Sequence, residues 1–169
     1  MIIGFCSFID GNLEIRQPDI EHWEGIKNLW EELKDSPSPI IKFDGNTDSK
    51  VLKDYLKISF NADWLHFYYA HNRETLEPYG FGIVQTVVAH TPDNSQIEIQ
   101  KKLFIRGVYV SPRAPRNTAK LLDDCACLHA KMHNITKIFG NCRLNFPTKA
   151  ALEKYGYSPS YIIMEKEIK

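Results

Sequence analysis

The sequence has no excess of charge of either sign and no long apolar run. Its 21 basic residues balance 21 acidic residues in a chain of 169 residues. A balanced chain has no general attraction for nucleic acid or an anionic membrane, so either partner would need a local patch. The longest apolar stretch, residues 80–89, is far too short to span a bilayer. The first six residues include no basic residue, so we expect no secretory signal and a soluble, cytoplasmic protein.

Cysteine is scarce, and the four cysteines form no C-x-x-C motif; they are Cys6, Cys125, Cys127 and Cys142. We therefore expect free, buried or half-buried thiols rather than disulfides or a redox site. His129 and His133 lie four residues apart with Cys125 one turn earlier, which is ligand spacing on a helix. No carboxylate or second Cys/His motif completes the set, so no metal site is predicted.

Hydrophobic periodicity predicts the order of the elements in one domain, residues 1–169. Apolar residues recur at helical spacing over residues 20–33, 49–60, 117–134 and 146–155. Aromatic and β-branched runs predict strands at residues 12–16, 64–71, 80–90, 97–110, 137–141 and 161–168. We expect a turn at residues 91–95 and an irregularity near Lys101 and Lys102. The predicted order, β-α-α-β-β-β-α-β-α-β, indicates a mixed α/β layer with an antiparallel front half and a β-α-β crossover.

The most informative stretch joins the strand that ends at Val110 to the helix that begins near Asn117. A strand, a tight polar loop and a first helical turn direct backbone N–H groups and the positive helix end at one spot. Such a spot suits a phosphate or pyrophosphate. Arg113 and Arg116 would add positive charge there, the alternative being two solvated loop arginines.

Three pieces of the sequence resemble the GNAT acetyltransferase superfamily. Residues 108–112 are similar to its fourth strand, residues 120–122 to the helix start after its cofactor loop, and Asn145 with residues 153–157 to its late helix and Gly-aromatic pair. The resemblance covers residues 13–168 and implies a single-domain, GNAT-like mixed sheet that binds acetyl-CoA. It implies cofactor contacts at Val108, Tyr109, Val110, Arg113, Arg116, Asn117, Thr118, Ala119 and Asn145.

Two features depart from the family pattern. In the cofactor loop, Asn117 replaces the first glycine, and asparagine is the non-glycine residue most tolerant of left-handed geometry. Pro115 has no N–H to offer to a phosphate. The family's late-helix tyrosine, which protonates the departing CoA thiolate, aligns with Leu152, so Tyr155 is either a substitute general acid or a core residue.

The reaction that the resemblance implies also needs a group that takes a proton from the incoming amine. Glu98, on the long strand, is the acidic candidate for this general base. Other candidates are the polar residues Tyr109, His66 and His71 near the predicted sheet. Their positions in the sequence do not show which of these residues or Glu98 is the general base.

The resemblance implies transfer of an acetyl group from acetyl-CoA to an unidentified amine, by direct attack in a ternary complex. No cysteine has the setting of a nucleophile. Acceptors would be selected by the loops at residues 36–49 and 73–79.

The alternative is a catalytically weakened GNAT-like scaffold that serves as an interaction protein. Its homodimer or protein partner would bind through an aromatic face, formed by Trp64, Tyr68, Tyr69 and Tyr79. The first helix and its Ser-Pro-Ser-Pro end also resemble acetyltransferase-like proteins encoded by phages, which implies a phage or virion-associated scaffold. A nucleic-acid partner is disfavoured because the chain has no basic stripe.

Overall fold

The computed structural model describes residues 7–35, 49–93, 96–140 and 147–158. Their elements, in chain order, are β1 (Phe8–Asp10), β2 (Leu13–Arg16), a 3-10 turn (Ile20–His22), α1 (Trp23–Asp35), α2 (Ser49–Ser59), β3 (Leu65–Asn72), β4 (Pro78–Asp93), β5 (Gln96–Val110), α3 (Thr118–Met132), β6 (Ile138–Gly140) and α4 (Pro147–Lys154). No helix within these ranges has the length and apolar character needed to cross a bilayer.

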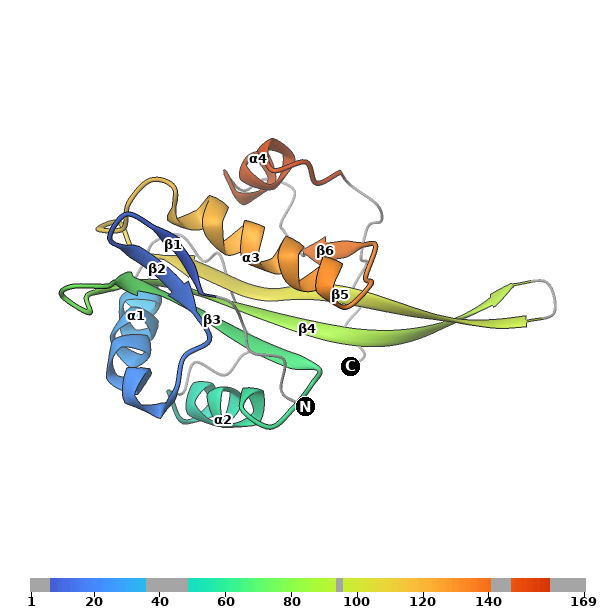
Figure 1. Cartoon of the computed structure of the whole chain (residues 1–169), viewed down its shortest axis with the longest axis horizontal. Coiled ribbons are helices and arrows are strands. Elements are labelled where there is room, and N and C mark those ends of the chain that lie inside the picture. The colour runs from blue at the N-terminus through green and yellow to red at the C-terminus, as the bar shows by residue number, and fades with distance from the viewer. Residues whose placement is uncertain (1–6, 36–48, 94–95, 141–146, 159–169) are drawn as a thin grey trace, which may run out of the picture.

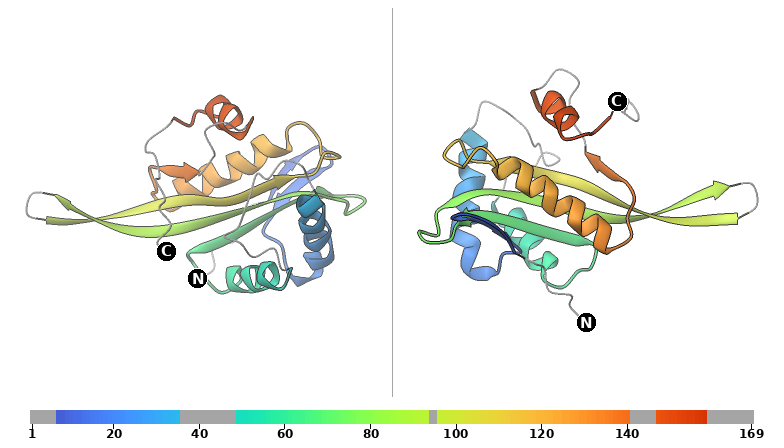
Figure 2. Two further views of the ribbon diagram at one scale, coloured as in Figure 1. Left: turned by 180° about the vertical axis from the view of Figure 1, so that it is seen from behind. Right: turned by 45° about the horizontal axis from the view of Figure 1, so that its top comes forward.

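The strands form one six-stranded sheet in the order β1-β2-β3-β4-β5-β6. Neighbouring strands are antiparallel except β5 and β6, which are parallel and joined through α3. Helices α1 and α2 cover one face of the sheet, α3 covers the other, and α4 lies beyond α3 (Figures 1 and 2). This arrangement confirms the predicted mixed α/β layer with its β-α-β crossover.

Most predicted elements are present, with three differences. The prediction missed β1, which pairs with β2 across a turn at Gly11, where the backbone φ of +59° favours glycine. The turn expected at residues 91–95 begins later, because β4 continues to Asp93. The strand predicted at residues 161–168 lies outside the described residues.

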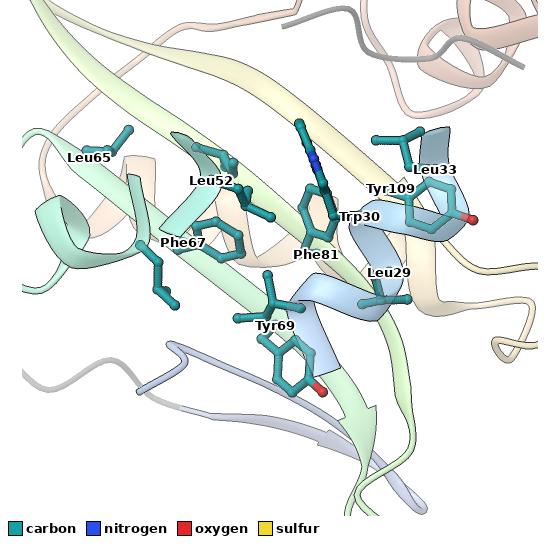
Figure 3. Close-up of a cluster of buried hydrophobic side chains, with 12 residues drawn as sticks. Leu29, Trp30, Leu33, Leu52, Leu65, Phe67, Tyr69, Phe81 and Tyr109 are labelled. Atoms are coloured by element: carbon teal, nitrogen blue, oxygen red, sulfur yellow. The ribbon is translucent and has the colours of Figure 1, made fainter. Parts of the chain in front are cut away.

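Two hydrophobic clusters hold the helices to the sheet. The first lies under α1 and α2 and includes Leu29, Trp30, Phe67 and Phe81 (Figure 3). The second lies under α3 and includes Leu103, Leu122 and Cys125. The apolar stripe of the first helix is therefore core, as the helical spacing predicted. Met132, at the end of α3, is 45% exposed and does not belong to this cluster.

The predicted aromatic face does not exist as a surface. Tyr68 and Tyr69 are only 1% and 2% exposed. Since successive side chains of a strand point to opposite faces, Tyr68 packs in the cluster under α3 and Tyr69 in the cluster under α1 and α2. Tyr79 is half-buried, and Trp64 is the exposed member, at 47%.

Three histidine rings lie together between the start of β3 and the end of α3. The ring centroids of His66 and His129 are 4.1 Å apart, and those of His129 and His133 are 4.4 Å apart. Burial lowers the pKa of His129 to about 3, and the two neighbouring imidazoles act in the same direction. Burial also lowers the pKa of His66. At neutral pH the folded protein therefore holds both imidazoles in the neutral form.

We expect the free energy of unfolding to decrease as the pH falls from about 6.5 to about 3. In this window the unfolded chain protonates His129 near its ordinary pKa and the folded chain does not, so each pH unit lowers the free energy of unfolding by about 1.4 kcal/mol. His129→Gln should remove the part of this pH dependence that comes from His129. The part that comes from carboxylates is the same in the wild type and the variant. Urea unfolding at a series of pH values measures the two slopes. Equal slopes in the two proteins would contradict the assignment.

Candidate functional site

The end of β5 separates from β6 at a β-bulge. Strand β6 pairs with β5 from Leu103 to Ile105 only. Opposite β4, Ile105 pairs with Val84 and Gly107 pairs with Ile83, so Arg106 is the extra residue of the bulge. A bulge bends a strand and increases its twist. Within the described residues, the β6 side of β5 from Arg106 to Val110 has no strand partner, so its backbone can bind an extended ligand. The irregularity predicted at residues 101–102 was therefore misplaced.

The loop after β5 is fixed by backbone hydrogen bonds. The Ser111 N–H donates to the Tyr79 carbonyl oxygen at 2.8 Å, which ties the end of β5 to β4. The N–H of Ala114 donates to the Ser111 carbonyl oxygen and the N–H of Thr118 to the Pro115 carbonyl oxygen, both at 3.0 Å. Pro115 therefore anchors the first turn of α3 through its carbonyl group, although it has no N–H of its own.

Helix α3 begins without a side-chain cap. Asn117 is the N-cap residue, but its amide nitrogen donates to the Asp10 carboxylate on β1. In the described part of the chain, the N–H groups of Ala119 and Lys120 donate to no acceptor. The Thr118 hydroxyl is buried without a partner there. Unpaired N–H groups at the positive end of a helix fit an anion.

The two arginines of the loop have different surroundings. The Arg113 guanidinium lies 3.2 Å from a carboxylate oxygen of Glu32 and 3.3 Å from one of Glu77. The Ser111 hydroxyl also donates to Glu32, at 2.9 Å. Arg113 therefore joins the loop to α1 and to the β3–β4 turn. Arg116 is exposed and makes no ion pair with any described residue, so its charge is available to a ligand.

The predicted contact residues of β5 divide between the two faces of the sheet. Tyr109 is 5% exposed and belongs to the cluster under α1 and α2, whereas Val108 and Val110 pack toward α3. Burial, with a contribution from Glu32, raises the pKa of Tyr109 to about 12. Tyr109 thus stays protonated at neutral pH and is disfavoured as a general base.

Gly80 allows β4 to approach the end of β5. It lies opposite Val110, and a Cβ at this position would lie 2.6 Å from the Tyr109 carbonyl oxygen. We expect Gly80→Ala to lower the free energy of unfolding by about 1–3 kcal/mol, because the strands must move apart. Gly82→Ala is the matched control on the same strand, where a Cβ would meet no atom closer than 3.7 Å. Urea unfolding of the two variants tests this, and equal losses would contradict it.

The end of α4 lies beside the first half of α3. The Gly156 N–H donates to the Glu153 carbonyl oxygen and the Tyr157 N–H to that of Leu152, and Gly156 has a φ of +89°. These bonds form a Schellman motif, which explains the glycine. Leu152 packs toward β6, near Gly140. Tyr155, directly after α4, is half-buried.

Tyr157 makes a contact that the sequence did not predict. Its hydroxyl donates to the Asp123 carboxylate on α3 at 2.7 Å. Burial raises the pKa of Asp123, and burial together with this carboxylate raises the pKa of Tyr157. Only the Gly-aromatic pair pointed to Tyr157, and nothing in the sequence paired it with a residue 34 positions earlier.

The candidates for a general base lie in different parts of the fold. Glu98 pairs with Thr91 in the outer part of β5, ten residues before Val108 or about 33 Å at about 3.3 Å per residue. His71 is 2% exposed beside Glu14, and His66 belongs to the histidine cluster. The structure thus brings the exit-loop residues together but does not bring Glu98 to them. Asn145 lies outside the described residues.

Two of the four cysteines lie in the described residues, and both are free thiols, as predicted. Cys125 is buried, and burial raises the pKa of its thiol to about 12. Over the same residues, no three histidine, cysteine or acidic side chains are grouped so as to hold a metal ion.

No protein-family model matches the chain, and no curated protein sequence matches it. Solved structures match its fold. The aminoglycoside N-acetyltransferase AAC(6')-Iy, in complex with a CoA bisubstrate analogue, is 18% identical, with a TM-score of 0.68 over 93% of this chain and 98% of that one. Glucosamine-6-phosphate N-acetyltransferase from Arabidopsis thaliana is also 18% identical, with a TM-score of 0.66 over 93% of this chain and 99% of that one.

A predicted acetyltransferase from Clostridium acetobutylicum, solved with acetyl-CoA, is 18% identical, with a TM-score of 0.68 over 92% of this chain and 96% of that one. Such low identities show the fold alone. The chain has the fold of the GNAT acetyltransferases, which confirms the resemblance seen in the sequence at the level of the fold.

Proposed function

We propose that the protein is an N-acetyltransferase that uses acetyl-CoA as its cosubstrate. The observation that carries the proposal is the continuous path from the free edge of β5, residues 106–110, to the uncapped start of α3. Structures with this fold hold CoA or acetyl-CoA, which supports the same ligand here.

The residues of this path fit the parts of CoA. The free β5 edge offers N–H and C=O groups at strand spacing to the amide-containing pantetheine arm. The unpaired N–H groups of Ala119 and Lys120 and the guanidinium of Arg116 suit the pyrophosphate. Arg113 positions the loop through Glu32 and Glu77. The exposed Asp10 carboxylate would repel the pyrophosphate. The surrounding N–H groups and the Arg116 guanidinium must therefore outweigh this repulsion.

The chemistry requires two proton transfers. The thioester of acetyl-CoA is the acetyl donor; the amine nitrogen attacks the carbonyl carbon and the C–S bond breaks. We assign the protonation of the departing thiolate to Tyr155, whose half-buried side chain lies at the end of α4. The amine proton passes to a general base. Glu98 lies about 33 Å along β5 from Val108, too far to take this proton, so His66 and His71 are the remaining candidates among the predicted residues. Direct transfer, without an acetylated enzyme, agrees with the state of Cys125. Its thiol has a pKa of about 12 and stays protonated at neutral pH, which makes it a poor nucleophile.

The acceptor is an amine of unassigned identity. The similar structures include enzymes named for aminoglycosides and glucosamine-6-phosphate, and these names describe those proteins. In this chain the β3–β4 turn is joined to the exit loop by Glu77 and Arg113, which places this turn beside the proposed cofactor site.

Thiol release from acetyl-CoA in the presence of an amine panel tests the proposal. The panel contains amino sugars, polyamines, arylalkylamines and lysine peptides, and each reaction is compared with an amine-free control. We expect at least one amine to raise thiol release well above the control, and Arg116→Ala to raise the KM for acetyl-CoA. Acetyl-CoA binding without turnover on any amine would favour the scaffold alternative, and the absence of binding would overturn the proposal.

A further inference from the structure

Two aromatic rings lie side by side on the face of β5 and β6 that is turned away from α3. Leu103, Ile105 and Ile138 belong to the cluster under α3. Since side chains alternate along a strand, Phe104 and Phe139 point to the opposite face, which carries α1 and α2. The register places these two residues directly opposite each other, and their rings stack with centroids 5.2 Å apart. Both rings are half-buried, so they form a partly exposed apolar floor.

A cation of the protein lies over each ring. The Lys102 Nζ is 5.5 Å from the ring centroid of Phe139, and the Arg106 Cζ is 5.7 Å from that of Phe104. The Arg106 Nε donates to the Gln85 side-chain oxygen at 2.6 Å, which fixes the guanidinium. Neither cation makes an ion pair with a described residue, and the two Nη atoms of Arg106 donate to no described acceptor. We call Lys102, Phe104, Arg106 and Phe139 the basic platform.

The basic platform lies where the proposed cofactor path ends. Arg106 is the extra residue of the bulge and the first residue of the free β5 edge. A pyrophosphate at the start of α3 directs the pantetheine arm back along this edge, over about 13 Å from Val110 to Arg106 at about 3.3 Å per residue. The thioester end of the arm therefore lies beside the platform. Ile105 and Val108 pack toward α3, so the acceptor approaches from the platform side of the sheet.

We propose that the basic platform binds an acidic group of the acceptor, so that the preferred substrates are small amines that also carry a carboxylate or a phosphate. The inference rests on the proposed acetyl transfer and names its acceptor class. The free terminal nitrogens of Arg106 form the pair that binds a carboxylate or phosphate in bidentate fashion. Two neighbouring cations without an ion-pair partner among the described residues attract an anion and repel a second ammonium group. The platform thus disfavours polyamines and other polycations.

Matched amines test the acceptor class in the thiol-release assay with the wild-type protein. γ-Aminobutyrate is compared with butylamine, and phosphoethanolamine with ethanolamine, because the members of each pair differ in the acidic group. We expect kcat/KM to be at least about 10-fold higher for the acidic member of one pair, and putrescine to be a poor acceptor. The pair with the larger ratio shows whether the platform prefers a carboxylate or a phosphate.

Variants on the two faces of β5 test whether the platform causes this preference. Arg106→Ala and Lys102→Ala should each lower the ratio of kcat/KM values for the acidic and the neutral amine by about 10- to 100-fold. Lys101→Ala is the matched control, because Lys101 is exposed and lies on the other face of the strand, and it should leave the ratio unchanged. Arg106→Glu should raise kcat/KM for putrescine above the wild-type value. Circular dichroism confirms that each variant is folded.

The outcomes separate this inference from the proposed function. Thiol release with equal kcat/KM for both members of both pairs, or with putrescine as the best acceptor, would overturn the acidic acceptor and leave acetyl transfer in place. Equal effects of Lys102→Ala and Lys101→Ala would remove the platform from the acceptor site. The absence of thiol release with every amine would overturn the proposed function, and this inference with it. If Arg106→Ala does not fold, the wild-type ratios and the two lysine variants still decide.

Discussion

Replacing Tyr155 by phenylalanine is expected to lower acetyl-transfer turnover by about 10² to 10⁴-fold, the range for loss of a positioned proton donor. The change removes only the phenol oxygen of a half-buried side chain at the end of α4, so the fold and the affinity for CoA should remain. Steady-state thiol release measures turnover, and calorimetry measures CoA affinity. Turnover within a few fold of wild type would identify Tyr155 as a packing residue.

Tyr157→Phe is the matched control for this experiment. It removes the 2.7 Å bond to Asp123 and should cost about 1 kcal/mol of stability without a comparable loss of turnover. The opposite pattern, in which Tyr157→Phe abolishes turnover and Tyr155→Phe does not, would move the acid to Tyr157. Leu152→Tyr adds the family residue at its aligned position and should increase thiol release if the proposed acid works poorly.

Changing Arg113 and Arg116 together to alanine is expected to weaken acetyl-CoA binding by about 2 to 4 kcal/mol, because the ligand loses one charge-assisted hydrogen bond to Arg116, which contributes about 1.5 to 3 kcal/mol, and the loop loses its attachment through Arg113. The structure indicates how this loss divides. Arg116→Ala should account for the larger part by removing the unpaired charge, and Arg113→Ala should act by releasing the loop from Glu32 and Glu77.

Glu77→Gln separates these two effects in the same calorimetric titration. It removes one carboxylate partner of Arg113 and leaves both arginines in place, so we expect a change in affinity smaller than that of Arg116→Ala. Unchanged affinity in the double alanine variant would remove both arginines from the site. A Glu77→Gln effect equal to that of Arg116→Ala would show that loop position matters more than the charge of Arg116.

The helices could be predicted because their signal is local. Trp23, Ile26 and Trp30 recur on one side of α1, and each packs where this spacing placed it. Strand β1 has three residues and no such pattern, so it was missed. The bulge at Arg106 was misplaced because it depends on the register with β4, which lies far away in the sequence.

The prediction of an aromatic surface was wrong because it ignored the alternation of side chains along a strand. Tyr68 and Tyr69 are adjacent in a strand, and adjacent strand residues point to opposite faces, each covered here by helices. Grouping aromatic residues by their nearness in the sequence ignored this alternation.

The candidate site was predicted in position but not in detail. The strand, loop and helix around Arg113 and Arg116 follow one another in sequence, so their meeting point could be inferred. The residues that pair with the loop, and so show what each loop residue does, are distant from it in the sequence. Glu32 lies 81 residues before Arg113, and Asp10 lies 107 residues before Asn117. Only the folded chain shows that Arg113 is paired, that Arg116 has no ion-pair partner among the described residues, and that no side chain of those residues caps the start of α3.

Calorimetric titration of the full chain with acetyl-CoA tests the central claim most directly. We predict saturable binding at one site per chain, with affinity that falls strongly in Arg116→Ala and hardly changes in Arg73→Ala, an exposed arginine of the β3–β4 turn. The absence of saturable binding to the folded wild-type protein, or equal losses in the two variants, would contradict the assignment of this fold to acetyl-CoA chemistry at the β5 exit loop.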